Sequence, residues 1–214
     1  MSTETTPEPA SLSPRATEAV KRSLTPRQEA ASRDVDRLIK AGRDLLTEGA
    51  PARVADIVAA AGLSNDAFYR YFRSKSDFVD AVVEEGGRRL VSYLRRKIDA
   101  AGSPEEALRA GVTAILNQAV DPGIAAATRN VVAVGGGRSH APKVREELEL
   151  ALARVLAGPI AALGSTDPER DSTTTSILLL ASMEHLLWKD NSGIDADKEV
   201  DHIVGYVRHA LRPD

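Results

Sequence analysis

The amino-acid sequence predicts an all-α protein, and three observations lead to that class. From Asp77 to the C-terminus apolar residues recur at helical spacing, and no alternating apolar segment has the length of a strand. Clusters of glycine, proline, asparagine and serine interrupt this pattern, and each cluster marks a turn. The 214 residues, 43% of them hydrophobic, are enough to bury a core in one large domain or two small ones.

Residues 1–32 form an N-terminal extension with two kinds of sequence. Residues 1 to about 12 are rich in Thr, Pro, Glu and Ser, a composition that predicts disorder. Ser13 and Pro14 predict a short helix through residue 24, and Thr25 with Pro26 predicts the start of a second helix. Between residues 15 and 33 basic side chains outnumber acidic ones by five to two. The five are Arg15, Lys21, Arg22, Arg27 and Arg33.

A long helix and a shorter helix follow this extension. The long helix carries one continuous apolar stripe, and Gly49 and Pro51 end it. The stripe consists of Val35, Leu38, Ile39, Gly42, Leu45 and Leu46. The shorter helix is predicted from about Pro51 to Ala61, because four apolar residues recur there at i, i+3, i+4 and i+7. They are Val54, Ile57, Val58 and Ala61.

The next residues predict a turn, a short aromatic helix and the start of another helix. Gly62 stands where a helix end favours a left-handed residue, and Ser64 can cap the helix that follows. Phe68 and Phe72 lie four residues apart and can anchor that helix to the core, which turns its polar residues to other faces. Ser74-x-x-Asp77 is the pattern of a capping box. The three-helix unit, assigned to residues 33–76, has the size of a helix-turn-helix domain.

The run from Ala61 to Lys75 closely resembles the DNA-binding signature of the TetR family of transcriptional regulators. The positions that match the family pattern are Ala61, Gly62, Leu63, Ser64, Phe68, Tyr69, Tyr71, Phe72, Ser74 and Lys75. Asp66 stands where the family often has Gly, and Ala67 where it often has Thr or Ser. The resemblance therefore implies the mode of DNA binding and leaves the operator sequence undetermined.

Eight residues form the predicted DNA-binding set. They are Ser64, Asn65, Asp66, Ala67, Tyr69, Arg70, Tyr71 and Lys75. The resemblance implies that Tyr69 and Lys75 bind phosphates; the alternatives are a half-buried tyrosine and a solvated lysine. Arg70 is expected to read a base, because arginine can bond guanine O6 and N7 together.

The other roles leave alternatives open. Asn65 can bond adenine, and Asp66 can accept from cytosine N4 or serve the helix dipole. Tyr71 can touch the DNA backbone or stack. The basic extension resembles an arm that follows phosphates or enters the minor groove, although charged segments are usually just solvated.

Residues 77–214 are assigned to a ligand-binding and dimerisation domain. Turns separate helices near 77–100, 104–119, 123–133, 141–163, 168–190 and 196–211. With three in front, these make about nine helices, the count that the resemblance implies. Gly158-Pro159 is expected to kink or break the helix that starts near Ala141.

The last two helices are expected to pair with their mates in a second subunit, as the resemblance implies. The predicted dimer contacts are Leu179, Met183, Leu186, Val200, Ile203, Val204 and Val207. The apolar residues of 168–190 spread around most of that helix, so it requires cover on more than one side. The alternative is that both faces are covered within one subunit.

A ligand cavity is expected between the helices of the C-terminal domain. Small residues around Gly111, Ala114, 125–128 and Ala133 could leave space, although they also allow close helix packing. Candidate lining residues are Asn117, Asn130, His140, Glu184, His185 and Trp188, each of which could instead be an ordinary surface or core residue. A mostly apolar small effector is expected. The glycine-rich run 135–140 lacks the strand context of a phosphate loop.

The residue inventory argues against an enzyme. The chain has no cysteine, and its four histidines are scattered, so we expect no metal site and no cofactor. No apolar run approaches a membrane span, and no signal-peptide core is present, which predicts a cytoplasmic protein. The net charge of -3 does not decide for or against DNA. The prediction is a ligand-responsive repressor that binds a palindromic operator as a homodimer; the alternative is a helical binding or scaffold protein without DNA binding.

Overall fold

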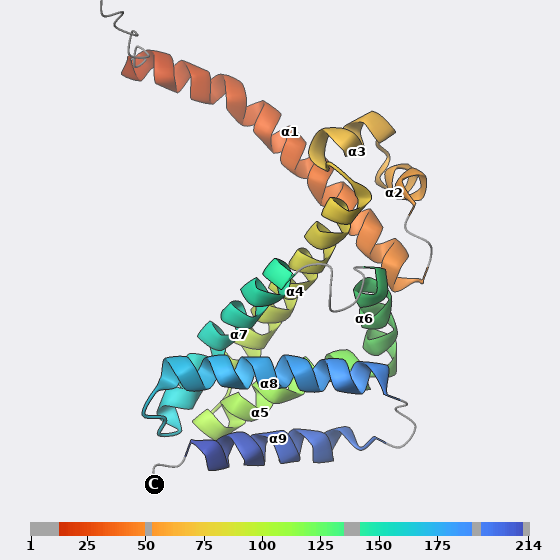
Figure 1. Ribbon diagram of the computed structural model, residues 1–214. Helices are drawn as coiled ribbons and strands as arrows, with labels where there is room; N and C mark the ends of the chain where they lie inside the picture. Colours follow the sequence, from red (N-terminus) through yellow and green to blue (C-terminus); the bar gives the residue numbers. More distant parts are fainter. Residues whose placement is uncertain (1–12, 50–52, 135–141, 190–193, 212–214) are drawn as a thin grey trace, which may run out of the picture.

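The computed structural model describes residues 13–49, 53–134, 142–189 and 194–211. Within these ranges the chain forms nine helices and no strand, which confirms the predicted all-α class (Figure 1). The helices are α1 (Pro14–Thr47), α2 (Val54–Ala61), α3 (Asn65–Tyr71), α4 (Lys75–Asp99), α5 (Pro104–Val120), α6 (Pro122–Val134), α7 (Pro142–Ala162), α8 (Pro168–Trp188) and α9 (Ala196–Ala210). The disorder predicted for residues 1–12 and the turn predicted at 135–137 lie outside the described residues.

Helix α1 is one continuous helix of 34 residues, so the predicted break at Thr25 and Pro26 is wrong. The hydroxyl of Thr25 donates to the carbonyl of Lys21, 2.9 Å away, and does not cap a new helix. Pro26 removes one backbone donor, but its neighbours Arg27, Gln28 and Glu29 are strong helix formers. Their propensity lets the helix continue through the proline.

The first hydrophobic cluster joins α1, α2, α3 and the start of α4. Its centre is the contact among three phenylalanines, with ring centroids 5.5 Å apart for Phe68 and Phe72, 5.2 Å for Phe68 and Phe78, and 5.1 Å for Phe72 and Phe78. Gly42 of α1 lies directly against this group, because a Cβ added there would sit 2.3 Å from Cζ of Phe78. A glycine therefore permits α4 to pack closely on α1.

The second cluster contains the far half of α4, part of α6, and helices α5, α7, α8 and α9, with α5 in contact with all the others. Its buried side chains are aliphatic. A Cβ on Gly111 would lie 3.1 Å from Cδ2 of Leu156, so this glycine serves close packing of α5 on α7. Of the two alternatives for the small residues, close helix packing therefore holds at Gly111; Ala114 and Ala125 are buried in the same core.

Helix α7 also corrects a sequence-based expectation. Pro159 lies inside the helix and is buried, and α7 continues beyond it to Ala162. A break at Gly158-Pro159 is therefore excluded. The packing of the buried Pro159 and Ile160 holds the last turn in place despite the missing backbone donor.

The seven side chains predicted as dimer contacts are all buried within a single chain. Leu179, Met183, Leu186, Val200, Ile203, Val204 and Val207 belong to the second hydrophobic cluster. Within the chain α5 and α7 cover these side chains on α8, and α5 covers those on α9. The large apolar side chains that these two helices leave exposed are Ile177, Trp188 and Tyr206.

No helix within the described residues is both long enough and apolar enough to cross a membrane.

Candidate functional site

A left-handed glycine ends α2 as predicted and sets the turn of the helix-turn-helix. Gly62 has φ 63° and ψ 40°. The N–H of Gly62 donates to Ala59 O, and that of Leu63 donates to Val58 O at 2.9 Å. These bonds satisfy two carbonyls at the end of α2. The start of α2 is Val54, with Arg53 as its cap, and the predicted start at Pro51 lies outside the described residues.

Helix α3 begins at Asn65 and is capped as predicted. The Ser64 hydroxyl accepts a hydrogen bond from the N–H of Ala67 at 3.1 Å. Phe68 is fully buried, and Phe72 at the C-cap is buried beside it. These two anchors turn the opposite side of α3 to solvent.

Helix α4 starts with a variant of the capping box. The Ser74 hydroxyl accepts from the N–H of Asp77 at 3.1 Å. The Asp77 carboxylate accepts from the N–H of Arg73 at 2.9 Å, one residue before the cap itself. Lys75 is therefore the first residue of α4, and its side chain is exposed.

The exposed face of this unit carries five of the eight predicted DNA-binding side chains with their polar groups free for a partner. They are Asn65, Asp66, Tyr69, Arg70 and Lys75. Tyr69 is 59% exposed, and its ring contacts Phe68 edge to face, so the buried ring holds the exposed one. The arrangement presents amide, carboxylate, phenol, guanidinium and ammonium groups together.

The structure places the other three predicted side chains differently. Ala67 is only 7% exposed and packs into the domain, so its side chain is not available to DNA. The Tyr71 hydroxyl donates to Asp34 Oδ2 of α1 at 3.1 Å, which makes this tyrosine a link between α3 and α1. The Ser64 hydroxyl is engaged in capping α3. A family pattern alone does not distinguish side chains that form contacts within the domain from those that are free to contact DNA.

Arg37 is a supporting residue that the sequence did not identify. Its Nη2 donates to the carbonyl of Gly62 at 3.3 Å, and its Nη1 lies 3.7 Å from Asp34. Asp34 in turn accepts from Tyr71. α1 thus braces both the turn and the end of α3, over sequence separations of 25 and 37 residues that no local pattern reveals.

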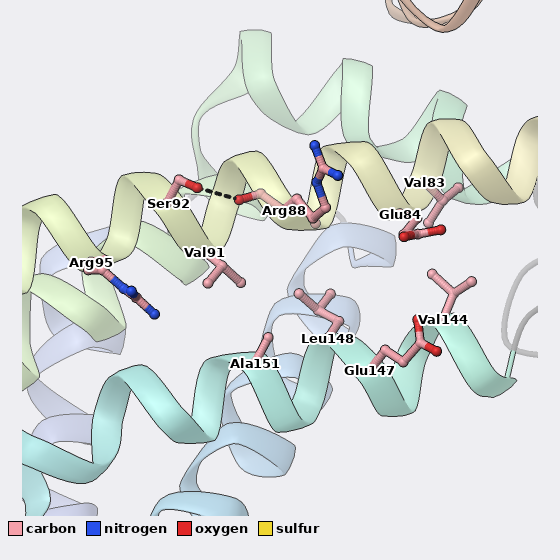
Figure 2. A pocket seen from close by; sticks show the side chains of 11 residues that line it. Val83, Glu84, Arg88, Val91, Ser92, Arg95, Val144, Glu147, Leu148 and Ala151 are labelled. Carbon is pink, nitrogen blue, oxygen red and sulfur yellow. Dashed lines mark hydrogen bonds between the residues drawn. The ribbon is translucent and has the colours of Figure 1, made fainter. Parts of the chain in front are cut away.

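A second candidate site is a groove of about 430 Å³ between α4 and α7 (Figure 2). Figure 2 shows Val91 of α4 facing Leu148 and Ala151 of α7 across it. Val83 and Val144 extend the apolar wall. Gly87 gives the Leu148 side chain room, because an added Cβ would lie 3.3 Å from its Cδ1.

Charged groups stand along the same groove. Glu84 and Glu147 lie at one end, and Arg95 lies near the other (Figure 2). Arg88 also borders the groove and pairs with Glu85 at 2.7 Å. The site therefore combines an apolar wall with charged rims.

None of the described side chains predicted to bind a ligand lines this groove. Asn117 lies on α5 and Asn130 on α6, while His185 and Trp188 are exposed on α8. Glu184 forms an ion pair with Arg145 of α7. His140 lies outside the described residues. The prediction chose residues by chemical type, and the groove is instead formed by the facing sides of two helices about 60 residues apart in sequence.

In the described part of the chain, no group of three His, Cys, Asp or Glu side chains is arranged to hold a metal ion.

Comparisons with known proteins bear on the helix-turn-helix and on the overall fold. Residues 38–82 match the model for bacterial regulatory proteins of the tetR family. Comparison with curated proteins gives no match. A TetR-family transcriptional regulator from Pectobacterium atrosepticum is 24% identical, with a TM-score of 0.62, over 86% of this chain and 95% of that one.

Two further solved structures have the same fold. The fatty acid degradation regulator FadR from Bacillus halodurans is 19% identical, with a TM-score of 0.58, over 83% of this chain and 99% of that one. RolR in complex with resorcinol is 17% identical, with a TM-score of 0.63, over 87% of this chain and 97% of that one.

An all-helical chain whose helix-turn-helix presents a polar face defines a DNA-binding transcriptional regulator. Residues 38–82 match the tetR family model, and the fold of the chain is similar to that of solved TetR-family regulators. Regulators of this family are DNA-binding proteins and not enzymes, in agreement with the residue inventory.

Proposed function

We propose that this protein is a ligand-responsive repressor that binds a palindromic DNA operator as a homodimer and is released by a small effector. The observation that carries the proposal is the exposed polar face of α3 beside Lys75 at the start of α4. Residues 33–76 act as the DNA-binding domain, and residues 77–214 bind the effector and the second subunit.

On this proposal the exposed side chains divide into two roles. Lys75 and Tyr69 bind phosphates, which position the protein without reading sequence. Arg70 reads guanine in the major groove, with Asn65 and Asp66 as further base contacts. Because two recognition helices are related by a two-fold axis, the operator is an inverted repeat with half-sites about 34–36 Å apart, or a multiple of that spacing.

Two substitutions test this division into phosphate-binding and base-reading side chains. Lys75→Ala should weaken binding to every duplex and lower the salt slope by about 1, whereas Arg70→Ala should relax preference at one base position at a cost of about 1–3 kcal/mol. Lys97→Ala, at the far end of α4, is the matched control and should change neither. Failure of the wild-type protein to select any duplex from a random pool would exclude the proposed function and favour a non-DNA-binding helical protein.

For the dimer, the exposed sides of α8 and α9 replace the seven buried residues as the proposed contact surface. On α8, Thr174, Ile177, Ala181, His185 and Trp188 are exposed at spacings of three and four. Ile177 is 46% exposed and Trp188 56%, and Tyr206 on α9 is 61% exposed. A partly apolar row of this kind on a helix surface suits pairing with a second copy.

Ile177→Glu tests this surface, because a charge in a dimer contact is costly when desolvated. The variant should sediment as a monomer with unchanged helix content and bind an operator poorly, since two linked half-sites bind far more tightly than one. Arg154→Glu, exposed on α7, serves as the control. An Ile177→Glu protein that remains dimeric would place the interface elsewhere.

The groove between α4 and α7 is the proposed effector site. Its apolar wall suits a mostly apolar small molecule, and its charged rims suit one polar end. The similar protein RolR was solved with resorcinol, a small aromatic molecule with hydroxyl groups. α4 connects this groove to Lys75, so a ligand that shifts α4 changes the position of the DNA-binding face.

The proposed release of DNA by an effector can be tested through the reciprocal effects of effector and operator on each other's binding. A compound that lowers operator affinity must bind the operator complex less tightly by the same factor. Leu148→Trp, which fills the groove, should abolish binding of such a compound and leave operator affinity intact. Calorimetry that gave equal affinities for free and DNA-bound protein would exclude that compound as the inducer.

A further inference from the structure

The first half of α1 has no packing partner in the described part of the chain. Every side chain from Thr17 to Ala30 is exposed, including Val20 at 44% and Leu24 at 52%, and α1 first buries a side chain at Leu38. Figure 1 shows this half projecting past α2 and α3, at the end of the molecule opposite α9. A helix that projects from the body in this way gains no stability from the core. Its exposed side chains are available to a binding partner.

Charge identifies the partner's chemistry. Residues 15–33 of α1 carry five basic and two acidic side chains, a net charge of +3 in a chain whose net charge is -3. Among the described residues none of the five basic groups forms an ion pair, whereas several arginines on the body do, such as Arg89 with Glu85 at 2.9 Å and Arg109 with Asp201 at 2.6 Å. Unpaired cations on an isolated helix suit a polyanion.

The spacing of the arginines gives the binding face. Arg15, Arg22 and Arg33 are separated by seven and eleven residues, about two and three helical turns, and so lie along one side of α1. At about 1.5 Å per residue the row is about 27 Å long, comparable to the rise of about eight base pairs. Lys21 and Arg27 lie on other sides of the helix.

We propose that this row binds the phosphate backbone of DNA outside the half-site that α3 contacts, and thereby lengthens the binding site without adding base specificity. The proposal rests on the proposed function, since it requires that α3 first place the protein on duplex DNA. The projecting half of α1 lies at the same end of the molecule as α3, so both can reach one duplex (Figure 1).

The test uses duplexes that the wild-type protein enriches from a random-sequence pool, either trimmed to the protected core or flanked by additional base pairs. The wild type should bind the flanked duplex more tightly than the trimmed one. The triple variant Arg15→Gln, Arg22→Gln, Arg33→Gln should lose this preference, and its salt slope on the flanked duplex should fall by about 0.9 for each phosphate that the variant no longer neutralises. Base preference in the core should not change.

A variant with the same change in net charge provides the control. Arg96→Gln, Arg154→Gln, Arg170→Gln removes three exposed arginines from α4, α7 and α8 and should keep the dependence on flank length. The pair Lys21→Gln, Arg27→Gln should have a smaller effect than the triple variant.

Two results overturn the inference while the proposed function stands: a wild type indifferent to flank length, or a triple variant that retains the wild-type preference. A larger effect from Lys21 and Arg27 than from the arginine row would overturn the assigned face. Absence of any duplex binding by the wild type would instead overturn the proposed function itself.

Discussion

The two hydrophobic clusters of this molecule are built from different kinds of side chain, although each holds its helices together. The cluster of the DNA-binding unit contains all three phenylalanines of the chain, in mutual contact. The larger cluster of the C-terminal region buries Leu, Ile, Val, Ala and Met, and no aromatic side chain is among its buried members. The difference follows helix length, since α2 and α3 have eight and seven residues.

A helix of two turns offers the core only two or three side chains, so large rings supply much of the buried area. The longer helices α4, α5, α7 and α8 offer many aliphatic side chains and tolerate a groove along part of their contact. The aromatic cluster therefore suits a rigid unit that holds a recognition surface. The aliphatic region suits a domain whose helices change their spacing when a ligand binds.

The sharpest test of this contrast is Phe78→Ala. Removing a fully buried ring from the small cluster should cost about 4 kcal/mol, because few neighbours can relax into the cavity. Hydrogen exchange should show reduced protection in α2 and α3, with α8 still protected. An equal reduction in α8 would mean that the two clusters unfold as one.

Leu156→Ala makes the corresponding change in the aliphatic cluster. We expect a cost of about 3 kcal/mol, measured by urea unfolding, with protection reduced first in α5, α7 and α8. Leu150→Ala is the control on the same helix, because Leu150 is 44% exposed. A reduction of protection confined to the DNA-binding unit would contradict the separation of the clusters.

The contact between α1 and α4 can be tested at a glycine. In Gly42→Ala the added Cβ would overlap Phe78, and overpacking of this kind costs about 2 kcal/mol. Gly86→Ala is the matched control on α4, where an added Cβ meets nothing, and should stabilise by up to about 1 kcal/mol. Thermal unfolding compares the two. Similar transition temperatures would show that the phenylalanine cluster shifts to accept the methyl group.

The smallest expected effect is a pH dependence that distinguishes the helix caps of the two regions. The N–H and the ammonium of Lys198 lower the pKa of the Asp195 carboxyl at the start of α9. Its contribution to stability is therefore present above the ordinary carboxyl pKa and lost as the pH falls through the lowered value of the folded state. α3 is capped by the hydroxyl of Ser64, which does not titrate.

An NMR titration of Asp195 should give a pKa below the ordinary value for aspartate, and fraying of α9 in acid should exceed fraying of α3. Asp195→Asn should remove this difference while keeping a cap. An ordinary pKa for Asp195 would contradict the capping geometry.

Features encoded within about five residues were predictable from the chain. The left-handed Gly62, the Ser64 and Ser74 caps and the inward pair Phe68 and Phe72 each depend on a hydrogen bond or contact to a near neighbour. The same locality explains why the helix ends at Gly49 and Gly164, both with positive φ, were recognisable as turns. For these elements the backbone geometry is a short-range property, so residue type and spacing sufficed.

Features that depend on what covers a helix were not predictable. The burial of Val204 by α5, the bond from Tyr71 to Asp34 and the groove between α4 and α7 each join segments 37 or more residues apart. An apolar stripe specifies that a face is covered, and it contains no information on whether the cover is the same chain or another. Long-range packing alone selects among the faces. For this reason the side chains predicted as dimer contacts are buried within the chain and those predicted to bind a ligand lie outside the groove, whereas the helix-turn-helix formed as expected.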